Sequence, residues 1–275
     1  MKLTILTNNS NKKTWRRNAK TMKTLIFIFI ASVLVFTSCK TKTAEVAPNV
    51  APNYIGESLT LGNGKAFTWL KVDANQNPTS IGVTLTKGAL DNLAHGAVTE
   101  FALPFTIDAS NKTPFNHVFL GFSHSGHEPL GTYDLAHFDL HFVMQPLSER
   151  QAIPVYLPAT AVKFDNLPAD GIIPKPYFRL PGGVPGMGVH WANPTSPELN
   201  GAKFTETFVM GSYDGKLTFY EPMITLDFLN SKPNITKPAP IPTKFTTAGY
   251  FPMKYSIKQV GDNIEISLDE MMMMK

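Results

Sequence analysis

The sequence His137-Phe138-Asp139-Leu140-His141-Phe142 alternates strictly between polar and apolar side chains. A period of two is typical of a β-strand, in which successive side chains point to opposite faces. We expect the apolar face of this strand to pack on a hydrophobic core. The other face carries two imidazoles and a carboxylate, whereas a solvated face more commonly carries Thr, Lys, Ser or Glu. We therefore interpret residues 137–142 as one wall of a polar site, with metal binding as the leading hypothesis.

Short strand-like segments separated by turn residues continue on both sides of this stretch. The clearest hairpins are predicted at residues 66–72 with 80–85, 203–210 with 216–220, and 250–260 with 263–268. A further strand is expected over 100–107, with an interruption at Pro104. We also expect a short helix over 87–93 capped by Thr86, and a Pro-rich loop over 233–242. The predicted fold class is all-β with minor α, as a single-domain β-sandwich or a cupin-like barrel.

The N-terminal region has the pattern of a bacterial lipoprotein signal. A charged start at Met22-Lys23 precedes an apolar run over 24–36 and the small residues before Cys39. Cys39 stands where the lipobox cysteine is lipidated. A single membrane-spanning helix is the alternative, but about 13 apolar residues are fewer than the ~20 that a bilayer core requires. We expect a protein of the cell envelope, attached by its lipid to the outer membrane or the periplasmic face.

These assignments divide the chain into four parts. Residues 1–39 are the predicted leader and signal peptide, 40–53 a flexible tether, 54–270 one β-rich domain, and 271–275 a tail. The leader holds seven of the 25 Lys and Arg residues and none of the 21 acidic ones, so the remainder carries 18 basic and 21 acidic side chains. Its formal charge is −3 and no basic run survives, which argues against a nucleic-acid partner.

Cys39 is the only cysteine, so a metal site in the domain must use His and carboxylate ligands. That donor set suits a divalent transition metal, namely zinc, iron, manganese or copper. Three segments supply candidates, and we expect three or four true ligands among six residues: His127, His137, Asp139, His141, His190 and Glu221. His137 and His141 are about 13 Å apart on a regular strand, so both reach one ion only if the strand bends.

The same residues also allow other interpretations. The histidines can form a hydrogen-bonded structural network without metal, in an envelope protein whose role is structural or an interaction with other proteins. An enzyme is the third hypothesis, with Glu128 or Glu221 as a general base beside a metal-bound water. The sequence carries no nucleophile elbow and no P-loop. It identifies no small-molecule ligand and does not decide whether the protein is an enzyme.

Four short motifs together resemble a family of secreted bacterial proteins. They are Gly-His-Glu-Pro at 126–129, His-Phe-Asp-Leu-His-Phe at 137–142, Met-Gly-Val-His-Trp at 187–191 and Tyr-Glu-Pro-Met-Ile-Thr at 220–225. That family is described as a domain of unknown function, with some members in envelope-stress regulons. The resemblance spans about residues 62–229. It implies one compact domain, a shared His/Glu set and a homo-oligomer, and it implies no activity.

Overall fold

The computed structural model describes residues 53–96 and 98–275. The predicted leader and signal peptide, the lipidation candidate Cys39, and the predicted tether up to residue 52 lie outside the described residues. Within the described part, every helix is too short to span a membrane.

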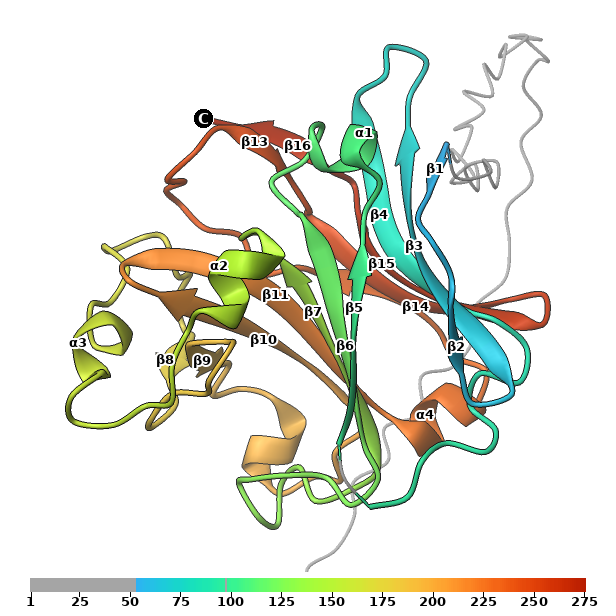
Figure 1. Cartoon of the computed structure of the whole chain (residues 1–275), viewed down its shortest axis with the longest axis horizontal. Helices are drawn as coiled ribbons and strands as arrows, with labels where there is room; N and C mark the ends of the chain where they lie inside the picture. Colours follow the sequence, from blue (N-terminus) through green and yellow to red (C-terminus); the bar gives the residue numbers. More distant parts are fainter. Residues whose placement is uncertain (1–52, 97) are drawn as a thin grey trace, which may run out of the picture. The chain divides into compact units, whose positions relative to one another are not determined.

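Two seven-stranded antiparallel sheets form the bulk of the domain (Figure 1). The first has the order β1-β3-β4-β15-β14-β12, and β2 pairs with β3 beside it. Its strands are β1 (Tyr54–Ile55), β2 (Leu59–Leu61), β3 (Gly64–Val72), β4 (Pro78–Leu85), β12 (Asn234–Pro238), β14 (Lys254–Val260) and β15 (Asn263–Asp269). The predicted hairpins β3–β4 and β14–β15 are both present, and the second turns at Gly261-Asp262 as expected.

The second sheet has the order β5-β6-β7-β11-β10-β9-β8. Its strands are β5 (Thr99–Pro104), β6 (His117–Ser123), β7 (His137–Val143), β8 (Phe178–Arg179), β9 (Val189–Ala192), β10 (Glu206–Tyr213) and β11 (Lys216–Thr225). Asp214 and Gly215 join β10 to β11 with positive φ angles of 50° and 77°, as a two-residue hairpin turn requires. β7 is thus an inner strand, flanked by β6 and β11.

The hydrophobic core lies between the two sheets. Phe138, Leu140 and Phe142 of β7 are fully buried there, together with side chains of the first sheet such as Leu70 and Ile81. The prediction that the apolar face of residues 137–142 packs on a core is therefore confirmed. The prediction of an all-β fold is also confirmed, and the architecture is sandwich-like.

Helical structure is limited to short connecting segments. They are α1 (Ile107–Ser110), α2 (Leu147–Gln151), α3 (Ala161–Phe164), the 3-10 helix η1 (Pro197–Asn200) and α4 (Leu226–Asn230). α1 and α4 have side-chain N-caps, because Thr106 accepts a hydrogen bond from the Ala109 amide and Thr225 accepts one from the Phe228 amide.

Several predicted elements are corrected by the structure. Residues 87–93 form turns rather than a helix, because Gly88 and Asn92 have positive φ angles. Thr86 caps nothing there, and its hydroxyl instead accepts a hydrogen bond from the amide of Lys65. The strand expected over 100–107 ends at Pro104, the residue of the predicted interruption, and does not resume. The strand expected over 203–210 begins only at Glu206.

The Pro-rich segment and the apolar tail also contain strands. Part of the predicted loop over 233–242 is β12, an edge strand on which proline is tolerated because one side of the strand is unpaired. At the C-terminus, β16 (Met272–Met274) pairs with β13 (Gly249–Phe251) as a separate two-stranded sheet. Met271 is buried in the main core and Met274 packs against it, whereas Met272 and Met273 are largely exposed.

Candidate metal centre

The polar face of β7 is buried as deeply as its apolar face. His137 is 0% exposed, Asp139 7% and His141 3%. A second layer of side chains covers this face: the ring centroids of His137 and Phe204 lie 5.4 Å apart, and Phe204 packs on Tyr133. Ionisable groups so far from water require partners.

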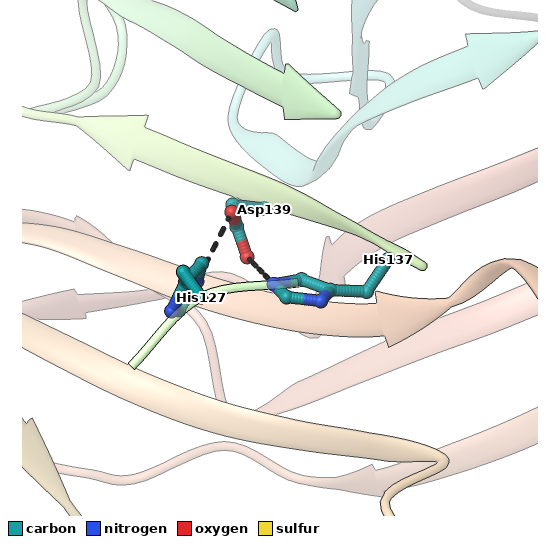
Figure 2. Close-up of side chains that lie close together, drawn as sticks. All are labelled: His127, His137 and Asp139. Atoms are coloured by element: carbon teal, nitrogen blue, oxygen red, sulfur yellow. Dashed lines mark ion pairs between the residues drawn. The ribbon is translucent and has the colours of Figure 1, made fainter. Parts of the chain in front are cut away.

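The first group of potential ligands consists of His127, His137 and Asp139 (Figure 2). Oδ1 of Asp139 lies 3.1 Å from Nε2 of His137, and its Oδ2 lies 3.5 Å from Nε2 of His127. His137 and Asp139 are two residues apart on β7 and therefore project from the same face. The side chain of His127 is 42% exposed, so this group borders the solvent on one side.

A folded-back loop brings His127 over β7. The amide of His127 donates a hydrogen bond to the carbonyl of Tyr133, and the Ser123 hydroxyl donates to the carbonyl of Gly126. Gly126 has a φ of 72°, and a Cβ there would lie 2.1 Å from the Tyr133 carbonyl oxygen. Only glycine fits this turn. Glu128, a candidate base, accepts a hydrogen bond from the amide of Leu130 and belongs to neither ligand group.

The second group consists of His141, His190 and Glu221, contributed by β7, β9 and β11. The pairing register on both sides of Pro222 places Glu221 opposite His141. Oε1 of Glu221 lies 3.1 Å from Nε2 of His141, and Oε2 lies 3.5 Å from Nε2 of His190. Glu221 is 2% exposed.

A glycine on β10 makes room beside this second group. Gly211 lies opposite both His190 and Phe219, and a Cβ at position 211 would lie 2.0 Å from Cε1 of Phe219. The Phe219 ring can therefore lie across β10, where its centroid is 4.8 Å from that of His141 and 5.2 Å from that of His190. This ring supports both imidazoles.

The orientations of the His137 and His141 rings leave Nε2 of each neutral ring without a proton. Nδ1 of His137 contacts the Leu135 carbonyl at 2.6 Å, and Nδ1 of His141 contacts the Phe119 carbonyl at 3.3 Å. A carbonyl oxygen only accepts, so each Nδ1 carries the hydrogen and Nε2 of the neutral ring is an acceptor. A backbone partner at the other ring nitrogen is also the usual support of a metal-binding histidine.

With these two rings neutral, Nε2 of His137 faces Oδ1 of Asp139, and Nε2 of His141 faces Oε1 of Glu221, as pairs of acceptors. Four buried atoms of the two groups have no hydrogen-bonded partner among the described residues: Nε2 of His137, Oδ1 of Asp139, Nε2 of His141 and Oε2 of Glu221. Two ligands about 2.0–2.1 Å from a tetrahedral ion lie roughly 3.3 Å apart. The observed separations of 3.1 Å and 3.5 Å fit that spacing in both groups.

Burial dominates the electrostatics of the second group. It lowers the pKa of His141 to about 3 and that of His190 to about 4. Burial also raises the pKa of Glu221 well above its usual value, and the nearby charge of Asp139 adds to that effect. A carboxylate at position 221 therefore requires a cation beside it.

The first group has the opposite balance. Burial works against ionisation of Asp139, but its contacts with His127 and His137 keep the pKa of the carboxyl below its usual range. Burial likewise opposes protonation of His127, yet the hydrogen bond and charge of Asp139 raise the pKa of this imidazole overall. His127 thus takes a proton more readily than His141 or His190.

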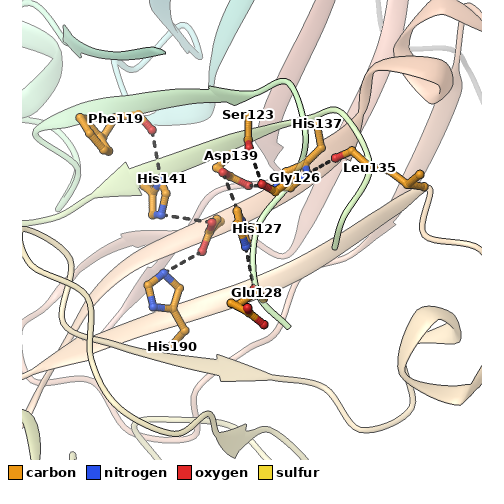
Figure 3. Close-up of polar contacts among 11 residues, drawn as sticks. Phe119, Ser123, Gly126, His127, Glu128, Leu135, His137, Asp139, His141 and His190 are labelled. Atoms are coloured by element: carbon orange, nitrogen blue, oxygen red, sulfur yellow. Dashed lines mark hydrogen bonds and ion pairs between the residues drawn. The ribbon is translucent and has the colours of Figure 1, made fainter. Parts of the chain in front are cut away.

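The structure brings all six sequence-predicted residues into these two groups, which lie next to each other on the outer face of the sheet (Figure 3). It divides them three and three, so His137 and His141 serve different groups and β7 needs no bend. Asp139 and His141, two residues apart on β7, are separated by about 7 Å along the strand. The groups are therefore neighbours, and each has its own carboxylate.

The remaining histidines lie outside the two groups. His95 and His124 contact each other at 3.1 Å, and Nδ1 of His117 faces Asn116 Oδ1 at 3.0 Å. Sequence reasoning missed the supporting residues Phe204 and Gly211, because their roles depend on contacts between distant strands. The only sequence signal for the role of Gly211 was the presence of a glycine next to a predicted strand.

Comparisons with known proteins add no assignment: no protein-family model, no curated protein and no solved structure matches this chain.

Proposed function

We propose that this protein is a metal-binding lipoprotein of the cell envelope, which holds one divalent transition metal ion in each of its two His₂-carboxylate groups. The envelope location and the lipid anchor at Cys39 rest on the sequence pattern of residues 22–39. The metal sites rest on the geometry of the six side chains. Both groups can hold an ion.

One observation carries the proposal. Nε2 of His141 and Oε1 of Glu221 are 3.1 Å apart in a buried environment, and the ring nitrogen has no hydrogen to donate because Nδ1 uses it. Two acceptors at this distance repel each other unless a metal cation or a proton lies between them. The same arrangement recurs at His137 and Asp139.

The donor set indicates the class of metal. Two imidazoles and one carboxylate suit zinc, iron or manganese, with copper a further option, and they disfavour calcium and magnesium, which bind mainly through oxygen. Three protein ligands leave coordination positions for water or another small ligand. Such a position is what an enzyme would need, but the proposal is limited to metal binding.

Elemental analysis of the purified full-length protein tests this proposal. We expect two equivalents of one transition metal per chain, and about one equivalent in either His137→Ala or His141→Ala. His124→Ala is the matched control, because His124 is an accessible histidine outside both groups, and it should retain both equivalents. Equal, trace metal contents in all four proteins would overturn the proposal.

A second candidate function is that of an interaction or structural protein of the envelope, which forms a homo-oligomer. Its histidines would then form a polar hydrogen-bonded network instead of binding metal. The raised pKa of Glu221 favours it, because a protonated carboxyl could donate to Nε2 of His141 across the 3.1 Å contact. This candidate predicts that chelators leave the melting temperature unchanged. The metal proposal predicts that they lower it, because an ion bound only by the folded protein stabilises that form.

A further inference from the structure

A cavity lies apart from the two groups of candidate metal ligands, beside the start of β11. It has a volume of about 590 Å³, and none of the six candidate ligands lines it. Its walls come from β11, from the residues that follow β7, from α2 and α3, and from the segment 244–251. In Figure 1 this is the end of the second sheet near α2 and α3. Pockets for small organic ligands typically have volumes of about 300–1,000 Å³.

Part of the cavity wall is apolar. Met144, Leu217, Phe245 and Phe251 line it, and the rings of Phe245 and Phe251 pack with their centroids 4.5 Å apart. Phe251 belongs to the main hydrophobic core, so this wall is backed by the sandwich interior. An apolar ligand body placed here would remove exposed hydrocarbon from water.

The rim of the cavity carries lysines. Lys163 pairs with Asp214 at 3.5 Å, whereas Lys216 and Lys244 are exposed and form no ion pair with other described residues. Glu149 is the other acidic residue of the lining. The three lysines outnumber the two carboxylates, so the entrance favours an anion.

From the cavity, the apolar wall and the lysine rim together, we infer that this protein binds a small amphiphilic organic anion at this site. The ligand has an apolar or aromatic body, held against Phe245 and Phe251. Its single carboxylate or sulfonate lies between Lys216 and Lys244. This inference does not depend on the metal proposal.

A matched pair of fluorescent dyes tests it on the full chain. Anilinonaphthalene sulfonate has an aromatic body and one anionic group, and N-phenylnaphthylamine has nearly the same body without the charge. We expect saturable binding of one sulfonate dye per chain. In the double variant Lys216→Gln, Lys244→Gln its Kd should rise about fivefold to tenfold, as the loss of two exposed charge contacts implies, while the Kd of the neutral dye changes by less than about twofold.

Two controls separate this result from general effects of charge or folding. Lys65→Gln with Lys175→Gln removes two exposed lysines that do not line the cavity and should leave both Kd values unchanged. His141→Ala should also leave them unchanged, which distinguishes this site from the metal groups. Non-saturable binding, or an equal loss of affinity in both double-lysine variants, would overturn the inference.

Discussion

Nε2 of His141 lies 3.1 Å from Oε1 of Glu221, on neighbouring strands and out of contact with solvent. The pairing of β7 with β11 fixes this contact, because the register places the two residues opposite each other. Both side chains are on the outer face of the sheet, while Phe142 and Tyr220 beside them enter the core. The fold thus fixes the ligand geometry before any ion binds, and the predictions below follow from that arrangement.

Glu221→Gln should abolish the stabilisation that metal confers through the second group. Glutamine keeps the size of the side chain but removes the charge that the ion requires. Each group should add about 2.7 kcal/mol to the free energy of unfolding at a free metal concentration about 100 times its Kd, and Glu221→Gln should lose the share of the second group. This corresponds to an increase of roughly 5–10 °C in Tm for a domain of this size.

Thermal melts with metal and with excess chelator measure this difference. Glu57→Gln, at an exposed position in neither group, is the control and should respond as the wild type does. A metal-dependent increase in Tm of the same size in Glu221→Gln would show that Glu221 is not a ligand.

The two groups should lose their ions independently. Asp139→Asn removes the carboxylate of the first group and Glu221→Gln that of the second, so each variant should bind one ion where the wild type binds two. Titration calorimetry of the metal-free proteins measures the stoichiometry. Binding of two ions by either variant, or of none by both, would contradict two separate sites.

Gly211→Ala should disturb the second group without touching a ligand. The new Cβ would lie 2.0 Å from Cε1 of Phe219, so the ring that supports His141 and His190 must move. Overpacking of this kind costs about 1–3 kcal/mol. We expect lower stability by chemical denaturation, and loss of one of the two ions.

Gly121→Ala is the matched comparison, because Gly121 lies on β6, the strand next to β7. Its Cβ would lie 3.7 Å from Asp139, which is ordinary contact. This variant should keep both ions and nearly the stability of the wild type. Equal behaviour of the two alanine variants would refute the role assigned to Gly211.

His117 should make the protein sensitive to acid. Burial, aided by the charge of Arg150, lowers the pKa of His117 from 6.5 to about 4 in the folded protein. The unfolded chain therefore binds the proton more readily, so the contribution of His117 to stability is complete above pH 6.5 and is lost as the pH falls toward 4. The loss amounts to at most about 3 kcal/mol.

Urea denaturation of the wild type and His117→Gln between pH 7 and pH 4 measures this effect. The stability of the variant should fall less steeply over that range, because glutamine does not titrate. Parallel pH profiles for the two proteins would show that His117 does not cause the sensitivity.

Local sequence patterns were sufficient to predict many strands of the two sheets. The alternation over 137–142 predicted which side chains of β7 enter the core, and turn residues located the hairpins around Asp214-Gly215 and Gly261-Asp262. The prediction of a helix over 87–93 was wrong. The apolar spacing of this segment resembles that of a helix, but Gly88 and Asn92 have positive φ angles that a helix does not allow. β12 was missed because prolines obscure an edge strand.

The division of the candidates into two groups could not be read from the sequence. It depends on the register between β7 and β11, and a shift of one residue would move Glu221 to the opposite face. Burial of the polar face was unpredictable for a similar reason. Phe204, which packs against His137, comes from a segment far away along the chain, and no local pattern links it to β7.

Anomalous X-ray diffraction from crystals of the metal-loaded protein, at the absorption edge of the bound metal, locates the bound ions. We expect two peaks, one about 2.0–2.2 Å from Nε2 of His137 and an oxygen of Asp139, the other at the same distance from Nε2 of His141 and an oxygen of Glu221. Crystals that show no anomalous peak between these atoms, with Glu221 instead hydrogen-bonded directly to His141, would contradict the metal proposal.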